Sequence, residues 1–322
     1  MSLDEKDKNA VPADDTKSMS AEEMLEKYDP EAGKRKLTGF WDKLISAICI
    51  IFAIFQLYTA TFGVMDAMLQ RAIHLAFGLA LIFLVYPASS KFDRTKMNPL
   101  DVVFAIVGVS TTAYIVINYS QLVLRAGMNT ETDFIVGVIG IIMVIEAARR
   151  TVGWPMIIVA LVFLLYAFLG PYAPGILAHR GVGYAEMFDH LWYTTEGIFG
   201  TPLGVSSTFI YLFILFGSYL EATGLGKFFI DLANAVAGWA AGGPAKVAVL
   251  SSGLMGTVSG SSVANVAGTG SFTIPMMKKL GYRPEFAGAV EASASTGGQL
   301  MPPVMGAAAF LMAEFVGVPY IE

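Results

Sequence analysis

The chain has 322 residues, of which 55% are hydrophobic and only 15% are charged, and its mean hydropathy is +0.61. This composition excludes an ordinary soluble domain and predicts a polytopic membrane protein that lies in the lipid bilayer. The formal net charge of −5 does not indicate nucleic acid as a partner, because the acidic excess lies in the polar N-terminal segment. The single cysteine, Cys49, excludes a disulfide scaffold and a cysteine-based metal site within the chain.

Residues 1–43 mix lysine with aspartate and glutamate, and they contain no apolar stretch followed by a small-residue cleavage motif. A cleaved signal peptide is therefore not expected. We predict a solvated, disordered cytoplasmic tail that precedes the first membrane span.

Continuous apolar runs follow at residues 44–62, 72–88, 102–119, 134–148, 155–170 and 205–220. As helices rising about 1.5 Å per residue, most are long enough to cross a hydrocarbon core of about 30 Å, which predicts an all-α fold. Lysine and arginine collect before the first run and after the second, fourth and sixth runs. Because cytoplasmic loops carry the positive excess, the N-terminus is expected on the cytoplasmic side.

Two segments mix aromatic side chains with charged or polar ones, at residues 183–199 and 226–241. This pattern predicts amphipathic helices that lie at the membrane interface. The four tryptophans fall at predicted interfaces and are interpreted as belt residues; they are Trp41, Trp154, Trp192 and Trp239.

Residues 251–275, SSGLMGTVSGSSVANVAGTGSFTIP, are small and hydroxylated although they lie in a chain that otherwise indicates membrane spans. The limbs on either side of residues 259–262 are each too short to cross the bilayer comfortably. Lysines near both outer ends predict a re-entrant hairpin whose second limb ends at Pro275.

The hydroxyls at the tip of this hairpin, together with Asn265, offer oxygen ligands to a hard cation, and half-helix N-termini attract anions. The alternative is an ordinary helix packed through small residues, because Gly256 and Gly260 have the spacing of a helix-packing motif.

A second interruption is expected at residues 293–303, SASTGGQLMPP. Two adjacent glycines and two adjacent prolines cannot all lie inside a regular helix without freeing backbone groups. Irregular backbone at membrane depth survives where it is buried in protein or lines a cavity. The paired interruptions therefore favour a binding cavity between them.

Three motifs occur in one order along the chain: TEGIFGTP at residues 195–202, GTVSGSSVANVAGTGSFTIP at residues 256–275, and PEFAGAVEASASTGGQLMPPVM at residues 284–305. With these motifs the chain resembles, from about Trp41 to its end, the fused permease of tripartite ATP-independent periplasmic (TRAP) transporters. Within that family it resembles most the type that works with TAXI-type binding proteins.

The resemblance implies a small-permease-like scaffold of four spans at residues 44–150 and the N-terminal part of a large transport subunit at residues 151–322. The large subunit of that family is an elevator built from two inverted repeats. Its first half would comprise the hairpin at residues 244–280 and the broken helix at residues 284–318. Fused permeases of the family continue beyond the corresponding point, so the chain is expected to be truncated or a fragment.

The resemblance also implies Na⁺ as the coupling ion and no further cofactor. The candidate sodium ligands at the hairpin tip and the helix break are Ser261, Ser262, Asn265, Thr296, Gly297 and Gly298. The candidate residues of the substrate cavity are Ser259, Thr269, Gln299, Met301 and Pro302.

The expected function is import of a small organic acid with a sodium or proton gradient across a bacterial or archaeal cytoplasmic (inner) membrane. The expected partner is a periplasmic TAXI-type solute-binding protein that delivers a small carboxylate. A channel-like pore or membrane scaffold subunit without coupled transport is the alternative. The sequence contains no HExxH, Walker or GxSxG motif, so an enzyme is not expected.

Ionisable side chains inside apolar segments are candidates for function. For Asp101, His74, Glu146 and Glu221, which lie near span ends, snorkelling or helix capping is the favoured interpretation. Glu291 precedes the second interruption, and either proton coupling or an ion pair with a nearby lysine or arginine would explain it.

Overall fold

The computed structural model describes residues 34, 35, 37–89 and 92–320. Most of the expected N-terminal tail, residues 1–33 and 36, lies outside these residues. In its described part, residues 40–43 already belong to helix α2 (Phe40–Phe62) and Arg35 is buried, so the prediction of a disordered tail is wrong for this part. In the described part of the chain, all regular secondary structure is helical, which confirms the all-α prediction.

Five helical segments meet the length and hydropathy expected of membrane spans within the described residues. They are α2 (Phe40–Phe62), α3 (Ala67–Val85), α4 (Pro99–Leu124), Trp154–Tyr172, which joins α6 (Trp154–Leu169) to η2 (Gly170–Tyr172), and Thr201–Ala222. The predicted run at residues 134–148 lies in α5 (Glu131–Thr151), which carries two acidic residues in its first turn and two arginines in its last. These charges keep α5 below the hydropathy of the other spans.

The chain forms two compact units, and α2, α3, α4 and α5 contribute residues to both. The first unit holds the described residues up to Ile45 together with Leu79–Val109 and Ile142–Val182. The second unit holds Ser46–Gly78, Ser110–Ile141 and the described residues from Gly183 onward.

A buried ionic cluster stabilises the first unit. The Asp101 carboxylate pairs with Arg35 and, at 2.7 Å, with Arg150, and all three side chains are excluded from solvent. Arg150 also donates to Glu146 at 2.9 Å, and its guanidinium lies over the ring of Phe83. Snorkelling or capping is therefore the wrong interpretation for Asp101 and Glu146, because their carboxylates are bound by arginines.

In the second unit a polar face of α3 holds the span at Thr201–Ala222. This span consists of α8 (Thr201–Val205), a π-helical turn η4 (Ser206–Ile210) and α9 (Tyr211–Ala222). Gln70 donates to the Ser207 carbonyl at 2.9 Å, and His74 lies 3.1 Å from the Ser206 hydroxyl. His74 is buried and also contacts Gln56 at 2.6 Å, so it does not snorkel.

The predicted interfacial segments form α7 (Tyr184–Tyr193) and α10 (Leu225–Ala237). Trp154 and Trp239 are exposed, but Trp192 at the end of α7 is fully buried. Its ring lies against Gly140 of α5, where any side chain would overlap it. The belt interpretation is therefore wrong for Trp192, which is a packing residue within the second unit.

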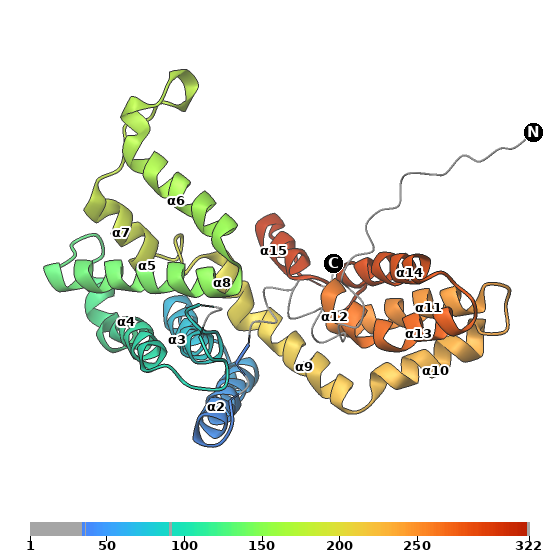
Figure 1. Ribbon diagram of the computed structural model, residues 1–322. Helices are drawn as coiled ribbons and strands as arrows, with labels where there is room; N and C mark the ends of the chain where they lie inside the picture. The colour runs from blue at the N-terminus through green and yellow to red at the C-terminus, as the bar shows by residue number, and fades with distance from the viewer. Residues whose placement is uncertain (1–33, 36, 90–91, 321–322) are drawn as a thin grey trace, which may run out of the picture. The chain divides into compact units, whose positions relative to one another are not determined.

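Four further helices of the second unit form a small bundle: α11 (Gly243–Ser259), α12 (Ser262–Gly268), α13 (Gly270–Lys279) and α14 (Pro284–Thr296). The last helix, α15 (Ala307–Val316), packs against α8 and η4. Figure 1 shows α11, α13 and α14 side by side, with α10 packed along α11. A short 3₁₀ turn, η5 (Gly297–Gln299), follows α14 and packs against α11. η3 (Gly175–Leu177) belongs to the first unit.

Candidate functional site

The first interruption lies between α11 and α12. α11 ends where Gly260 adopts a left-handed conformation, with φ of 60°. Ser261 then caps α12, because its hydroxyl accepts a hydrogen bond from the Ala264 amide at 3.3 Å. A side chain at position 260 would overlap the carbonyl of Met305. Only glycine therefore satisfies both the backbone conformation and the space at this turn.

The alternative of one continuous helix is wrong, because Gly260 and Ser261 leave the helical conformation. One part of the hairpin prediction is also wrong. Pro275 does not end the second limb, since α13 continues through it to Lys279. A proline removes one backbone donor, and here the helix tolerates that loss.

The second interruption begins later than predicted. Residues 293–296 are still helical in α14, because none of them is a glycine or proline. The backbone leaves the α-helix at η5, continues through an irregular segment at residues 300–306, and returns to helix at Ala307. The Pro302–Pro303 peptide bond is cis.

The second interruption packs against α11 at a pair of glycines, about one turn before the first interruption. A Cβ added to Gly256 would lie 2.5 Å from the Cα of Gly298, and one added to Gly298 would overlap the side-chain amide of Asn265. The α11 backbone and the η5 backbone are therefore in direct contact. Gly256 does act as a packing residue, as the small-residue alternative expected, but its partner is the second interruption.

Two further contacts join the same segments. The Gln299 side chain donates to the Ser262 hydroxyl at 3.2 Å. The Val304 amide donates to the Thr257 carbonyl at 3.3 Å. The predicted tip residues and the predicted break residues thus form one site within the second unit.

Asn265 is the central residue of this site and is fully buried. Its side-chain nitrogen donates to the Ser252 carbonyl at 3.1 Å, and its side-chain oxygen accepts from the Ser259 hydroxyl at 2.5 Å. These bonds fix the amide orientation. They leave the second lone pair of the amide oxygen as an acceptor for a cation.

Not every candidate lies at the contact. Thr296 is exposed, and its hydroxyl donates to the Ala292 carbonyl of its own helix at 2.9 Å. Gly297 is half-buried with an open Cβ position. Met301 and Pro302 are exposed on the irregular segment. The structure therefore joins Ser259, Ser262, Asn265, Gly298 and Gln299, with Ser261 as the helix cap, and it leaves these other four candidates outside the contact.

Thr269, predicted to line a substrate cavity, is instead buried behind the tip. Its hydroxyl lies 2.5 Å from a carboxylate oxygen of Glu291, which is itself fully buried. Glu291 also accepts hydrogen bonds from Thr273 and, at 3.1 Å, from Ser295. Among the described residues no lysine or arginine pairs with Glu291, so the ion-pair interpretation is wrong.

Three further hydroxyl residues surround Glu291 or the tip and were not predicted as site residues: Ser252, Thr273 and Ser295. The hydroxyls of Ser252 and Ser295 lie 3.0 Å apart. Thr273 follows Thr269 by four residues and Ser295 follows Glu291 by four. Because residues four apart share one face of a helix, this spacing is the signal that would have placed them on facing helices.

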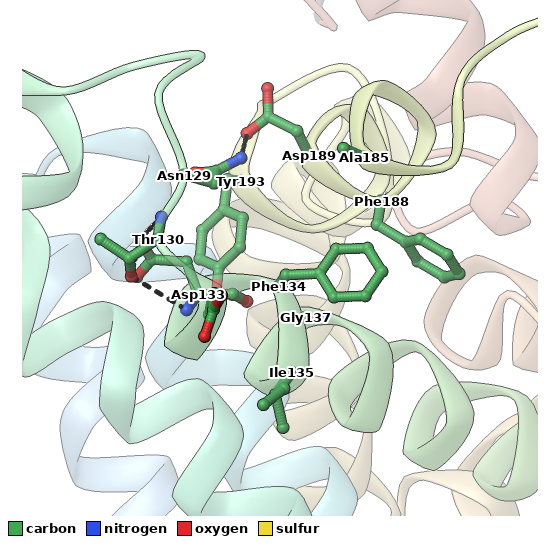
Figure 2. A pocket seen from close by; sticks show the side chains of 11 residues that line it. Asn129, Thr130, Asp133, Phe134, Ile135, Gly137, Ala185, Phe188, Asp189 and Tyr193 are labelled. Carbon is green, nitrogen blue, oxygen red and sulfur yellow. Dashed lines mark hydrogen bonds between the residues drawn. The ribbon is translucent and has the colours of Figure 1, made fainter.

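A separate cavity of about 390 Å³ lies between the start of α5 and α7 (Figure 2). Figure 2 shows Phe134 and Phe188 at one side of this cavity and Tyr193 beside Asp133. Asn129 donates to Asp189 at 2.5 Å at its rim, and Glu131 also lines it. Its carboxylates would repel a carboxylate ligand, so we place no anion there.

Comparison with known families supports the assignment that the two interruptions suggest. Residues 139–322 match the model of the family described as "Tripartite ATP-independent periplasmic transporter, DctM component". The chain belongs to the DctM family. This family is one of transporter permeases, so the chain is a permease sequence rather than an enzyme, and it is a multi-pass membrane protein.

Curated relatives agree with the DctM assignment. A C4-dicarboxylate TRAP transporter large permease protein of Vibrio cholerae is 32% identical over 153 residues, which are 45% of this chain and 33% of the relative. The protein of the same description from Pseudomonas aeruginosa is 41% identical over 91 residues, 28% of this chain and 21% of that protein.

A 2,3-diketo-L-gulonate TRAP transporter large permease protein of Escherichia coli is 34% identical over 91 residues, which are 28% of this chain and 21% of the relative. The chain thus spans a third or less of the length of these DctM relatives. No solved structure matches the chain.

Proposed function

We propose that the chain acts in the permease of a secondary transporter that imports a small organic acid together with sodium, with protons as the alternative coupling ion. A periplasmic binding protein, of TAXI type, would deliver the substrate. The observation that carries this proposal is the contact of α11, at Gly256, with the second interruption, at Gly298, with the buried Asn265 amide beside it. Family membership supports the transporter class.

The neighbouring groups suit a cation of low charge density. Asn265 and Ser259 supply neutral oxygens, and the interruptions release backbone carbonyls that helical hydrogen bonding would otherwise occupy. A carboxylate substrate would bind next to the cation, which would neutralise it. The substrates after which two relatives are named, a C4-dicarboxylate and 2,3-diketo-L-gulonate, are carboxylates, which supports an organic acid here.

We further propose that residues 44–150 act as a scaffold and that residues 151–322 supply the transport part, with the hairpin at residues 244–280 and the broken helix at residues 284–318. The family match begins at residue 139, within α5, close to this boundary. The distribution of lysine and arginine supports a cytoplasmic N-terminus in the inner membrane.

Uptake by the complete permease and its binding protein, reconstituted in liposomes, tests the proposal. An imposed inward sodium gradient should drive accumulation of the organic acid. Accumulation that is indifferent to both sodium and proton gradients would exclude coupled transport and would leave a pore or scaffold role. An ATP requirement would exclude the class altogether.

Two alanine variants refine the assay. S261A and N265A should reduce sodium-dependent uptake at least tenfold while the protein still inserts and folds. S271A is the matched control, because Ser271 is exposed on α13 and its hydroxyl bonds only the Gly268 carbonyl. If N265A transports normally, the site is misplaced.

A further inference from the structure

Glu291 is a carboxylate buried immediately behind the α11–α12 tip. Its side chain is fully excluded from solvent, and Gly270 of α13 lies so close that an added Cβ would be 3.0 Å from the Glu291 Cγ. The groups that reach its oxygens are the hydroxyls of Thr269, Thr273 and Ser295. Its surroundings are therefore polar but uncharged.

An ionised carboxylate in such a place is costly unless a positive charge lies near it. In the described part of the chain no lysine, arginine or histidine forms an ion pair within 4.0 Å of the Glu291 carboxylate. The ion pairs found there join other residues. Lys278 and Lys279 at the end of α13 are exposed to solvent. Hydroxyl donors stabilise the anion in part, but no positive charge among these groups balances it.

The same carboxylate is adjacent to the tip. The Thr269 hydroxyl lies 2.5 Å from a Glu291 oxygen and 2.8 Å from the carbonyl oxygen of Asn265. On the other side, Ser295 contacts both Glu291 and the Ser252 hydroxyl, and the Ser252 carbonyl accepts the Asn265 amide. Two hydrogen-bond lengths thus separate the carboxylate from the backbone of Asn265.

We propose that Glu291 is the fixed counter-charge of the cation bound at the α11–α12 tip. It does not touch the ion. The tip offers neutral oxygens, and the negative charge one layer behind them attracts the cation through a medium of low dielectric constant. This inference rests on the proposed sodium site, and it explains why an acidic side chain is buried there without a basic partner.

Glutamine at position 291 separates charge from structure. Its oxygen can still accept from Thr269 and Ser295. Its side-chain amide can donate to the oxygen of the Thr273 hydroxyl. That hydroxyl can then donate its own hydrogen to the Thr269 carbonyl, 3.1 Å away. E291Q therefore retains the local hydrogen bonds and removes only the charge. E285Q is the matched control, because Glu285 lies on the same helix and is exposed.

The test measures thermal unfolding of the full chain in detergent, titrated with sodium chloride against choline chloride at equal ionic strength. Stabilisation by a ligand rises with its concentration relative to the dissociation constant, so the titration gives a sodium midpoint. The midpoint should rise at least tenfold in E291Q and stay unchanged in E285Q. Without sodium, E291Q should melt at or above the wild-type temperature, since a neutral side chain costs less to bury.

The outcomes distinguish the two proposals. If sodium does not stabilise the wild type more than choline does, the sodium site itself is refuted. If sodium stabilises the wild type and E291Q with the same midpoint, only the counter-charge role of Glu291 is overturned. If E291Q does not fold, E291D keeps the charge on a shorter side chain and should bind sodium within about tenfold of wild type; complete loss of sodium stabilisation in folded E291D would also overturn the inference.

Discussion

The contact between Gly256 and Gly298 gives a quantitative prediction for G256A. Carbon atoms in contact prefer separations of about 3.5–4.0 Å, whereas the new Cβ would lie 2.5 Å from the Gly298 Cα. The obstructing atom is backbone, which cannot rotate away as a side chain does. Overpacking of this kind costs about 1–3 kcal/mol.

G253A is the control, because Gly253 lies one turn earlier in the same helix. Its Cβ would be 3.6 Å from the terminal methyl of Met301, which is ordinary contact with a flexible side chain. Replacing a helical glycine by alanine gains about 1 kcal/mol in either variant, so this gain cancels in the comparison. The difference between the variants isolates the backbone overlap.

Unfolding in detergent, followed by circular dichroism against temperature or denaturant, measures the two variants. G256A should be less stable than G253A by about 1–3 kcal/mol, and it should lose sodium stabilisation because η5 is displaced. Equal stability of G256A and G253A would show that α11 and η5 do not approach each other at the backbone, and the described site would then be wrong.

Three further predictions concern other parts of the chain. D101N should destabilise the protein by about 3–5 kcal/mol, because it leaves Arg35 buried without a negative partner and leaves Arg150 with Glu146 alone. D93N, at an exposed position, should change the free energy of unfolding by less than about 0.5 kcal/mol. G140A should lower the melting temperature by several degrees, because the new methyl group overpacks against the Trp192 ring at a cost of about 1–3 kcal/mol. The control G78A meets open space and should leave the melting temperature unchanged. A wild-type melting temperature for G140A would contradict the burial of Trp192. Burial, and then the neighbouring Asp133 carboxylate, raise the pKa of the Tyr193 phenol above its ordinary value of 10.0. The folded protein therefore keeps the phenol proton at a pH where the unfolded chain releases it. Because of this difference, the free energy of unfolding should fall as pH rises from about 9 to about 11. Y193F should show a smaller fall over the same range, and an identical slope in both proteins would refute the assignment.

The apolar runs predicted the helical framework well, because lipid demands about twenty apolar residues per span and the sequence records this directly. The interruption at Gly260 was also predictable, since only a few residues tolerate a left-handed conformation. Pro275 shows the limit of such reasoning. A proline disfavours a helix locally, but packing of α13 against α11 and α14 retains the helix through it.

The site was predictable in part. Asn265, Ser262 and Gln299 follow from polar residues at the interruptions, and the structure brings them together. Their backing layer was not predictable, because it depends on which faces of α11, α13 and α14 meet. The prediction for Trp192 was wrong for the same reason. An aromatic residue near a predicted interface is equally suited to pack against a glycine of a neighbouring helix, as Trp192 does against Gly140.

The glycine contact has a mechanical consequence. Side chains between two helices normally absorb small shifts by changing rotamer, but no side chain separates Gly256 from Gly298. A displacement of the α11–α12 tip by a fraction of an ångström is therefore passed directly to η5 and the irregular segment after it. An ion that shifts the α11–α12 tip would therefore shift η5 in the same step, so the two segments move together as one rigid element.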